Sequence, residues 1–298
     1  MKRTSVTSLF LLLLIMITLL SCNKSRSIDI DLPEYKKQLV VECYLEPGKP
    51  YRLLLTESVS YFDVPSIPQV QDAVVTITFK GQTDTLKHVY ITLGNPDSTK
   101  LFNFYLDKIV PEVYNEPFRL HITDGKGRRI TAETMLLPPV KADTIRYVFE
   151  EMDSTGYAIT EIDTKIAGND YFRFLLLDQQ AGSTTLAQDI YFDANLTTTS
   201  PYLIKHNGVI LIKSKNRISR FPTVSGRQFI NLYHVEEAYY KYLKSVSDSK
   251  TANGNPFAQP PGLKTNVEGG LGIFTGLSLT QLHLEPPKSV QLNVTEPK

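Results

Sequence analysis

Few side chains in this 298-residue sequence stand at spacings that are typical of a catalytic or metal site. The chain contains no Gly-x-Ser-x-Gly nucleophile elbow, no His-Glu-x-x-His motif and no phosphate-binding loop that ends in Gly-Lys-Ser or Gly-Lys-Thr. The five histidines are scattered, and no two stand at the spacing of metal ligands. They are His88, His121, His206, His234 and His283. We therefore expect a protein that is not an enzyme and that holds no metal and no cofactor.

Three weaker patterns have simpler interpretations. The glycines of residues 269–272 (GGLG) lack the spacing of a dinucleotide loop and precede a strand, which indicates a turn. Asp29, Asp31 and Glu34 offer carboxylates to Ca²⁺, but they are too few and have no glycine turn, so solvated charge is favoured. Two carboxylates can also serve a glycosidase. Because spacing cannot show that two of them face each other, a hydrolase is kept as a third hypothesis.

The N-terminus carries the clearest signal. Lys2 and Arg3 precede an apolar run over residues 9–20, which is too short to span a bilayer. Residues 19–22, Leu-Leu-Ser-Cys, resemble a bacterial lipobox. The pattern predicts a signal peptide over residues 1–21, lipid on Cys22 and a tether over residues 22–30. Several acyl chains provide stable anchoring to outer-membrane lipid. The alternative is an ordinary signal peptide with an incidental cysteine.

The second cysteine, Cys43, lies in a segment that alternates apolar residues with period two. Leu39, Val41, Cys43 and Leu45 share one face of the predicted strand. We expect Cys43 to be a small buried hydrophobe and not a catalytic thiol. Because lipid occupies Cys22, no disulfide is available to the mature chain.

The rest of the chain predicts a mainly β protein. The formal net charge of +1 argues against nucleic acid as a partner. Residues 31–138 contain short alternating segments of the size of an immunoglobulin-like β-sandwich. One of them places Phe118, Leu120 and Ile122 on one face with His121 pointing outward, and residues 124–127 then predict a hairpin turn.

Pro138 and Pro139 indicate a seam, and a second β-rich domain is expected over residues 139–298. Strands are expected at residues 171–177, 188–193, 208–214, 227–235 and 271–284, the first of them central in its sheet. One short helix is predicted over residues 236–246, where Tyr239, Tyr242, Leu243 and Val246 recur at helical spacing. Core packing is the favoured role of this stripe, and ligand binding is the alternative. Residues 247–270 are rich in Ser, Asn, Gly and Pro, which predicts a long irregular loop.

Two blocks of sequence resemble a known family. The first comprises residues 28–33 (IDIDLP), 38–42 (QLVVE), 45–48 (LEPG) and 55–58 (LTES). The second comprises residues 254–257 (GNPF), 260–261 (PP) and 265–274 (TNVEGGLGIF). Together they resemble domain-of-unknown-function family 4249, lipoproteins of the Bacteroidota that tend to be encoded beside TonB-dependent receptors.

The resemblance implies a location and a partner. It places the protein at the outer membrane, anchored by lipid, with a TonB-dependent β-barrel receptor as a candidate partner. The family has no agreed activity, so no catalytic residue is carried over. Surface-exported lipoproteins of this lineage often have acidic residues after the lipidated cysteine, whereas residues 23–26 here are Asn-Lys-Ser-Arg. The periplasmic and the surface face of the membrane therefore both stay open.

The second block also supplies a candidate partner or ligand loop. Its residues are Asn255, Pro256, Phe257, Asn266, Glu268, Gly269 and Gly270. Well-specified loops on rigid scaffolds often carry function. The alternative is a structural role, in which Phe257 fills an apolar pocket and the two glycines make a sharp turn.

These observations lead to one main hypothesis and one alternative. The main hypothesis is a lipid-anchored outer-membrane protein that is a non-enzymatic accessory to a TonB-dependent transporter, through substrate capture or docking on the barrel. The alternative is a free-standing adhesin or a glycan- or peptide-binding module. The absence of tryptophan weakens the hypothesis of glycan binding, although Tyr and Phe can take its place.

Overall fold

The computed structural model describes most of the chain after the predicted tether. The described residues are 35–60, 63–64, 66–93, 100–142, 144–149, 155–162, 170–180, 183–196, 201–206, 210–214, 217–221, 227–253 and 262–284. Cys22 and residues 255–257 of the candidate loop lie outside them. The chain divides into residues 1–36 and residues 37–298, and every element below belongs to the second unit. Within the described residues, no helix has the length and apolarity needed to cross a membrane.

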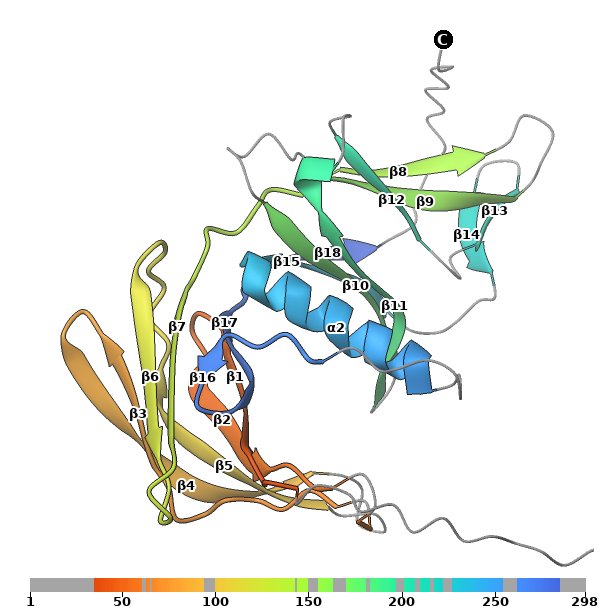
Figure 1. Ribbon diagram of the computed structural model, residues 1–298. Helices are drawn as coiled ribbons and strands as arrows, with labels where there is room; N and C mark the ends of the chain where they lie inside the picture. Colours follow the sequence, from red (N-terminus) through yellow and green to blue (C-terminus); the bar gives the residue numbers. More distant parts are fainter. Residues whose placement is uncertain are drawn as a thin grey trace, which may run out of the picture. The chain divides into compact units, whose positions relative to one another are not determined.

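A nine-stranded sheet contains the first seven strands of the described chain (Figure 1). Its order is β16-β7-β6-β3-β4-β5-β2-β1-β17. The bounds are β1 (Leu39–Leu45), β2 (Pro50–Glu57), β3 (Val74–Phe79), β4 (Gln82–Leu93), β5 (Lys100–Ile109), β6 (Pro117–Thr123), β7 (Arg129–Met135), β16 (Val267–Glu268) and β17 (Leu271–Gly276). The sheet therefore takes strands from both sides of residue 138.

One short C-terminal segment supplies both outer strands of this order. β16 pairs with β7, with Val267 opposite Ala132, and β17 runs parallel to β1, with Gly272 opposite Val41. Only Gly269 and Gly270 separate the two strands, so the sheet is nearly closed. The mainly β class is confirmed. The expected immunoglobulin-like sandwich is not confirmed. That fold has two separate sheets, whereas β1 to β7 here share one strand order.

The core of the nine-stranded sheet follows the expected alternation. Leu39, Val41, Cys43 and Leu45 are fully buried, which confirms that Cys43 packs as a small apolar side chain. Phe118, Leu120 and Ile122 point into the same core, while His121 is exposed on the opposite face of β6.

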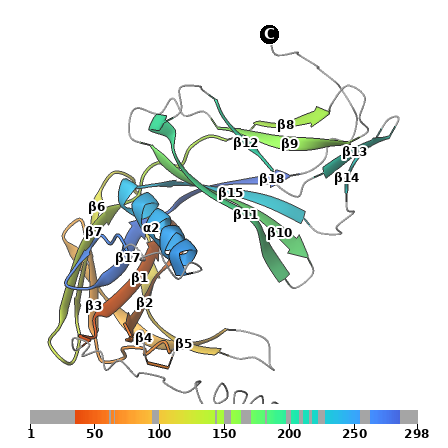
Figure 2. The ribbon, with the colours of Figure 1, turned by 45° about the vertical axis from the view of Figure 1, so that its right-hand side comes forward.

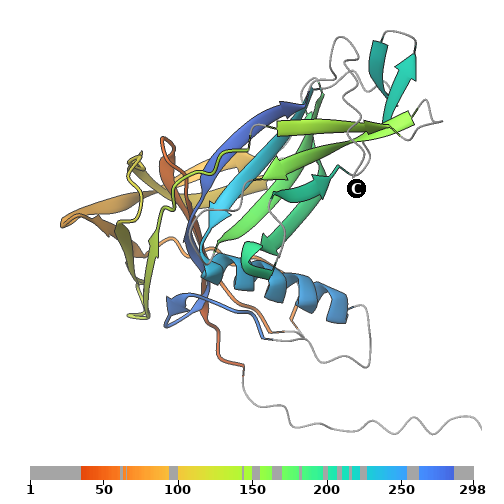
Figure 3. The same cartoon turned by 90° about the horizontal axis from the view of Figure 1, so that it is seen from above.

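The remaining strands form two further sheets that share a core. The four-stranded sheet has the order β11-β10-β15-β18, and the strands lie side by side in Figure 3. The five-stranded sheet has the order β12-β9-β13-β14, and its fifth strand, β8, pairs with β9. Their bounds are β8 (Thr144–Phe149), β9 (Thr155–Ile162), β10 (Tyr171–Gln180), β11 (Ser183–Asp193), β12 (Tyr202–Lys205), β13 (Ile210–Ser214), β14 (Arg217–Phe221), β15 (Arg227–Val235) and β18 (Ser278–Leu284), with a 3₁₀ turn, η2 (Ala194–Leu196), after β11. The segment expected to be central, β10, lies between β11 and β15.

Helix α2 (Glu237–Asn253) packs against β10, β11 and β17 (Figure 2). The expected helix ended at residue 246, so the prediction of a loop over residues 247–253 was wrong. Polar residues do not end a helix whose outer face is solvated, and Ser and Thr side chains can bond to the carbonyl one turn earlier. Thr251 Oγ1 does this by donating to the Ser247 carbonyl at 3.0 Å.

Candidate functional site

The described part of the candidate loop holds the nine-stranded sheet together. Asn266 Nδ2 donates to the Phe274 carbonyl at 2.6 Å, and the Phe274 N–H donates to Asn266 Oδ1 at 3.0 Å. Thr265 Oγ1 donates to the Gly272 carbonyl at 2.7 Å. The amide of Asn266 thus binds backbone on β17 in the way that a neighbouring strand would.

The glycines of this segment permit close backbone contacts. Gly269 has φ +84°, and a Cβ there would lie 2.1 Å from the Arg129 carbonyl oxygen. A Cβ on Gly270 would lie 2.7 Å from the Leu39 carbonyl oxygen. Only glycine fits such positions without a clash. The neighbouring Glu268 is exposed and accepts a long hydrogen bond from Thr131 Oγ1, at 3.4 Å. The geometry therefore supports a structural role for Asn266, Gly269 and Gly270.

The tyrosine stripe of α2 packs in a third apolar cluster. Tyr239 is buried, and Tyr242 and Leu243 are partly buried against the same cluster. Arg173 of β10 donates to the Tyr239 hydroxyl at 2.6 Å and makes two bonds to Asp189, at 3.0 and 2.8 Å. The guanidinium thus makes three hydrogen bonds to protein groups, and the two to Asp189 have the bidentate geometry that arginine favours.

The two buried histidines also make polar contacts within the chain, although His206 Nδ1 has no hydrogen-bond partner among the described residues. His234 Nδ1 lies 2.7 Å from the Pro138 carbonyl oxygen, and Nε2 lies 3.1 Å from Asp170 Oδ1. His206 Nε2 lies 2.6 Å from Thr160 Oγ1, and burial lowers the pKa of His206 to about 4. Across the described residues, no three His, Cys, Asp or Glu side chains form a group that suits a metal ion.

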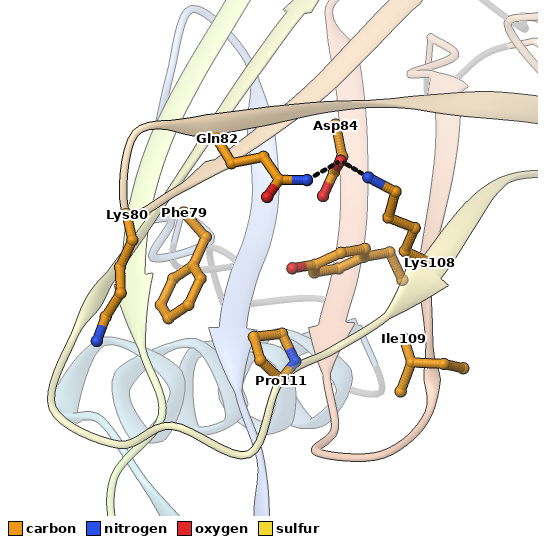
Figure 4. Close-up of a pocket in the computed structure, with 8 residues that line it drawn as sticks. Phe79, Lys80, Gln82, Asp84, Lys108, Ile109 and Pro111 are labelled. Carbon is orange, nitrogen blue, oxygen red and sulfur yellow. Dashed lines mark hydrogen bonds and ion pairs between the residues drawn. The ribbon is translucent and has the colours of Figure 1, made fainter.

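A pocket of about 380 Å³ lies at the rim of the nine-stranded sheet where its central strands β2, β3, β4 and β5 begin or end (Figure 4), and it is called the edge pocket below. Its volume is at the small end of the range for small-molecule sites. It is lined by Tyr51, Phe79, Lys80, Gln82, Asp84, Lys108, Ile109 and Pro111. The lining comes from the start of β2, the hairpin between β3 and β4, the end of β5 and the loop that follows β5.

The hairpin between β3 and β4 positions one side of the pocket. Phe79 pairs with Gln82, so the connection is only Lys80 and Gly81. These two residues have φ +48° and +80°, the signs required by a two-residue type I′ turn. Phe79 stacks on the buried ring of Phe118, with centroids 4.2 Å apart and planes 14° apart. The Phe79 ring is therefore supported from the core side.

Polar groups form the opposite wall. Asp84 Oδ1 accepts hydrogen bonds from Gln82 Nε2 at 3.2 Å and from Lys108 Nζ at 2.5 Å. Lys80 is paired with Glu116 at 3.4 Å. Sequence reasoning missed this pocket. The alternation of Gln82 and Asp84 on one face of β4 was visible, but their meeting with Lys108 depends on the pairing of distant strands.

Comparison with known proteins gives one match. The sequence model of a family described as Domain of unknown function (DUF4249) matches residues 25–282, which is most of the chain. No curated protein matches the sequence.

Proposed function

Since this chain belongs to the family described as Domain of unknown function (DUF4249), we propose that it is a lipid-anchored outer-membrane protein and a non-enzymatic accessory to a TonB-dependent transporter. It would capture substrate or dock on the barrel. The observation that carries this proposal is the lipobox that ends at Cys22, together with the short distance from it to the fold. The first strand begins at Leu39, 17 residues later, so a fully extended tether reaches about 60 Å at most.

Two structural features support a binding role over a catalytic one. Both ring nitrogens of the buried His234 have partners within the chain, and the guanidinium of Arg173 donates to Tyr239 and Asp189. The edge pocket instead presents an aromatic ring beside polar side chains, which is the composition of a small-molecule binding site. Capture of a ligand near the membrane surface is consistent with both features.

Membrane fractionation tests the anchor. We expect the wild-type chain to stay with membranes after a high-salt wash, and the Cys22→Ala chain to become soluble with an unchanged fold. Ser21→Ala is the matched control, because it keeps a small residue beside the cysteine and should stay in the membrane fraction. If the washed Cys22→Ala chain remained with the membranes, lipid on Cys22 would not be the anchor.

Affinity purification tests the partner. The tagged wild-type chain is extracted from native outer membranes in mild detergent, and the co-purifying proteins are identified by mass. A TonB-dependent barrel in stoichiometric amount is the expected result. Recovery of the chain alone would contradict the transporter role.

The pocket also supports a second candidate function, that of a free-standing binding module for a glycan or a peptide. The two functions differ in what accompanies the protein in the membrane. If the chain binds its ligand and purifies without a barrel, it is a free-standing binding module. Co-purification with a barrel favours the role of accessory to a transporter.

A further inference from the structure

We propose that the edge pocket binds one pyranose unit of a neutral carbohydrate, between the ring of Phe79 and the polar wall of Gln82 and Asp84. This inference deepens the capture role proposed above by assigning its ligand class. The pocket itself belongs to the folded unit over residues 37–298, so it can be tested without a transporter.

An aromatic platform suits the C–H face of a sugar ring. The face of an aromatic ring is electronegative and attracts weakly positive hydrogens. Phe79 lines the pocket and is held by its stacking on Phe118. Tyr51, Ile109 and Pro111 add further apolar surface. A rigid ring loses little conformational entropy on binding, which favours affinity.

Two acceptor oxygens face the same space. Gln82 and Asp84 are two residues apart on β4, so their side chains share one face of the sheet. The bonds from Gln82 and Lys108 both reach Oδ1 of Asp84. Within the described chain, no protein donor bonds to Asp84 Oδ2 or to Gln82 Oε1, and Figure 4 shows both oxygens directed into the pocket. Adjacent acceptors of this kind suit the donors of two neighbouring hydroxyl groups.

The charges of the lining favour a neutral ligand. Lys108 is paired with Asp84 and Lys80 with Glu116, so each ammonium already has an acidic partner. A phosphate or carboxylate ligand would also meet the carboxylate of Asp84 inside the pocket, which is unfavourable. A purely apolar ligand would leave Asp84 Oδ2 and Gln82 Oε1 without hydrogen bonds. A polyhydroxylated ring satisfies both surfaces.

Lys80, which lines the pocket, has a backbone conformation that is unusual for a residue other than glycine. Lys80 adopts φ +48°, a conformation that favours glycine or asparagine. Its ammonium lies 5.7 Å from the centroid of the Phe79 ring, at the side of the pocket. The two-residue turn between β3 and β4 requires a positive φ at Lys80, so the conformation follows from the hairpin.

Binding to simple glycosides tests the proposal. The purified full chain, in a detergent without a sugar headgroup, is titrated with the methyl pyranosides of glucose, galactose, mannose and N-acetylglucosamine. Calorimetry and ligand-observed saturation-transfer NMR report binding. We expect saturable binding of at least one glycoside. Asp84→Asn should weaken it about tenfold or more, because it replaces a charged acceptor. Phe79→Leu should weaken it by a similar factor, because it removes the ring.

Glu133→Gln is the matched control. It breaks an exposed ion pair with Arg119, at 2.7 Å, on the same sheet but outside the pocket lining, and should leave affinity unchanged. No glycoside binding, preferential binding of inorganic phosphate or choline, or an affinity equal to that of the wild type in both Asp84→Asn and Phe79→Leu would overturn the proposal. A barrel that co-purifies without glycoside binding would refute this inference alone. Glycoside binding without a barrel would refute only the transporter role.

Discussion

The carboxylate of Glu236 accepts hydrogen bonds from the hydroxyl of Thr134 and from the N–H of Met135, about one hundred residues earlier in the chain. Thr134 Oγ1 also accepts the N–H of Gly276, at 3.1 Å. Glu236 directly precedes α2, whereas Thr134 lies on β7 and Gly276 ends β17. One buried hydroxyl therefore connects the start of the helix to two strands of the nearly closed sheet.

Removal of this carboxylate should destabilise the fold. Glu236→Ala leaves the Thr134 hydroxyl and the Met135 N–H without their acceptor, at a cost of about 1–3 kcal/mol in the free energy of unfolding. Glu236→Gln keeps an acceptor and should cost less. Denaturant titration at pH 7 measures both. Equal stability of the alanine variant and the wild type would contradict the role of Glu236.

The pH dependence of this site has a definite sign. Burial raises the pKa of Glu236, although the hydrogen bonds of Thr134 and Met135 oppose it. The folded state then holds the proton to higher pH than the unfolded state. The stabilisation that comes from this difference in pKa is therefore present below about pH 4.5 and is lost as pH rises, while the hydrogen bonds from Thr134 and Met135 remain. The stability of the wild type relative to Glu236→Gln should therefore fall between pH 4.5 and pH 7.

The adjacent Glu237 is the control for that trend. It is exposed, and the hydrogen bond from Lys241, at 2.8 Å, lowers the pKa of Glu237. Its contribution is present above about pH 4.5 and is lost as pH falls. The free energy of unfolding of the wild type, measured against that of Glu237→Gln, should therefore rise with pH, opposite to the trend for Glu236→Gln. Two slopes of the same sign would contradict this account.

Closure of the sheet should depend on Gly272. Its φ is +116°, and a Cβ there would lie 1.9 Å from the Val41 carbonyl oxygen. Gly272→Ala must displace β17 from β1, so we expect a loss of more than about 3 kcal/mol or an insoluble chain. Gly127→Ala is the matched control, since Gly127 has φ +78° with nothing within 4 Å. It should cost about 1 kcal/mol. Thermal unfolding compares the two, and similar losses would contradict a steric role.

Acid should destabilise the protein through His206. Burial lowers the pKa of His206 to about 4, so the unfolded chain takes up a proton between about pH 6.5 and pH 4 that the folded chain excludes. This difference removes up to about 3 kcal/mol of stability as pH falls through that window. The stability of the wild type, measured against that of His206→Gln, should fall by this amount between pH 7 and pH 4. A constant difference would mean that His206 takes up its proton at the same pH in both states.

The thiol of Cys43 should report unfolding. Burial raises the pKa of this thiol, and the thiolate is the reactive form. In the Cys22→Ala chain Cys43 is the remaining cysteine. We expect negligible reaction with a maleimide in buffer and complete reaction in denaturant. The Cys22→Ala/Cys43→Ala chain measures the background, and rapid labelling of the native chain would contradict the packing described here.

Local patterns predicted the elements well where their burial is one-sided. Leu39 to Leu45 and Phe118 to Ile122 alternate because one face of each strand is apolar, and the structure places those faces in the core. The start of α2 follows from its tyrosine spacing, but its end does not, because a solvated helical turn has no apolar signature.

Residue types and local spacing are enough to predict the mainly β class, the burial of Cys43 and the membership of the family, and they give the N-terminus its resemblance to a lipobox. These features depend on residue types that are close together in the chain. Two features became visible in the folded chain alone: residues 267–276 nearly close the sheet of β1 to β7, and Asp84 bonds to Lys108 beside Phe79. Those contacts join residues far apart in sequence, and they arise from strand pairing and backbone approach, which leave no periodic signal in the chain.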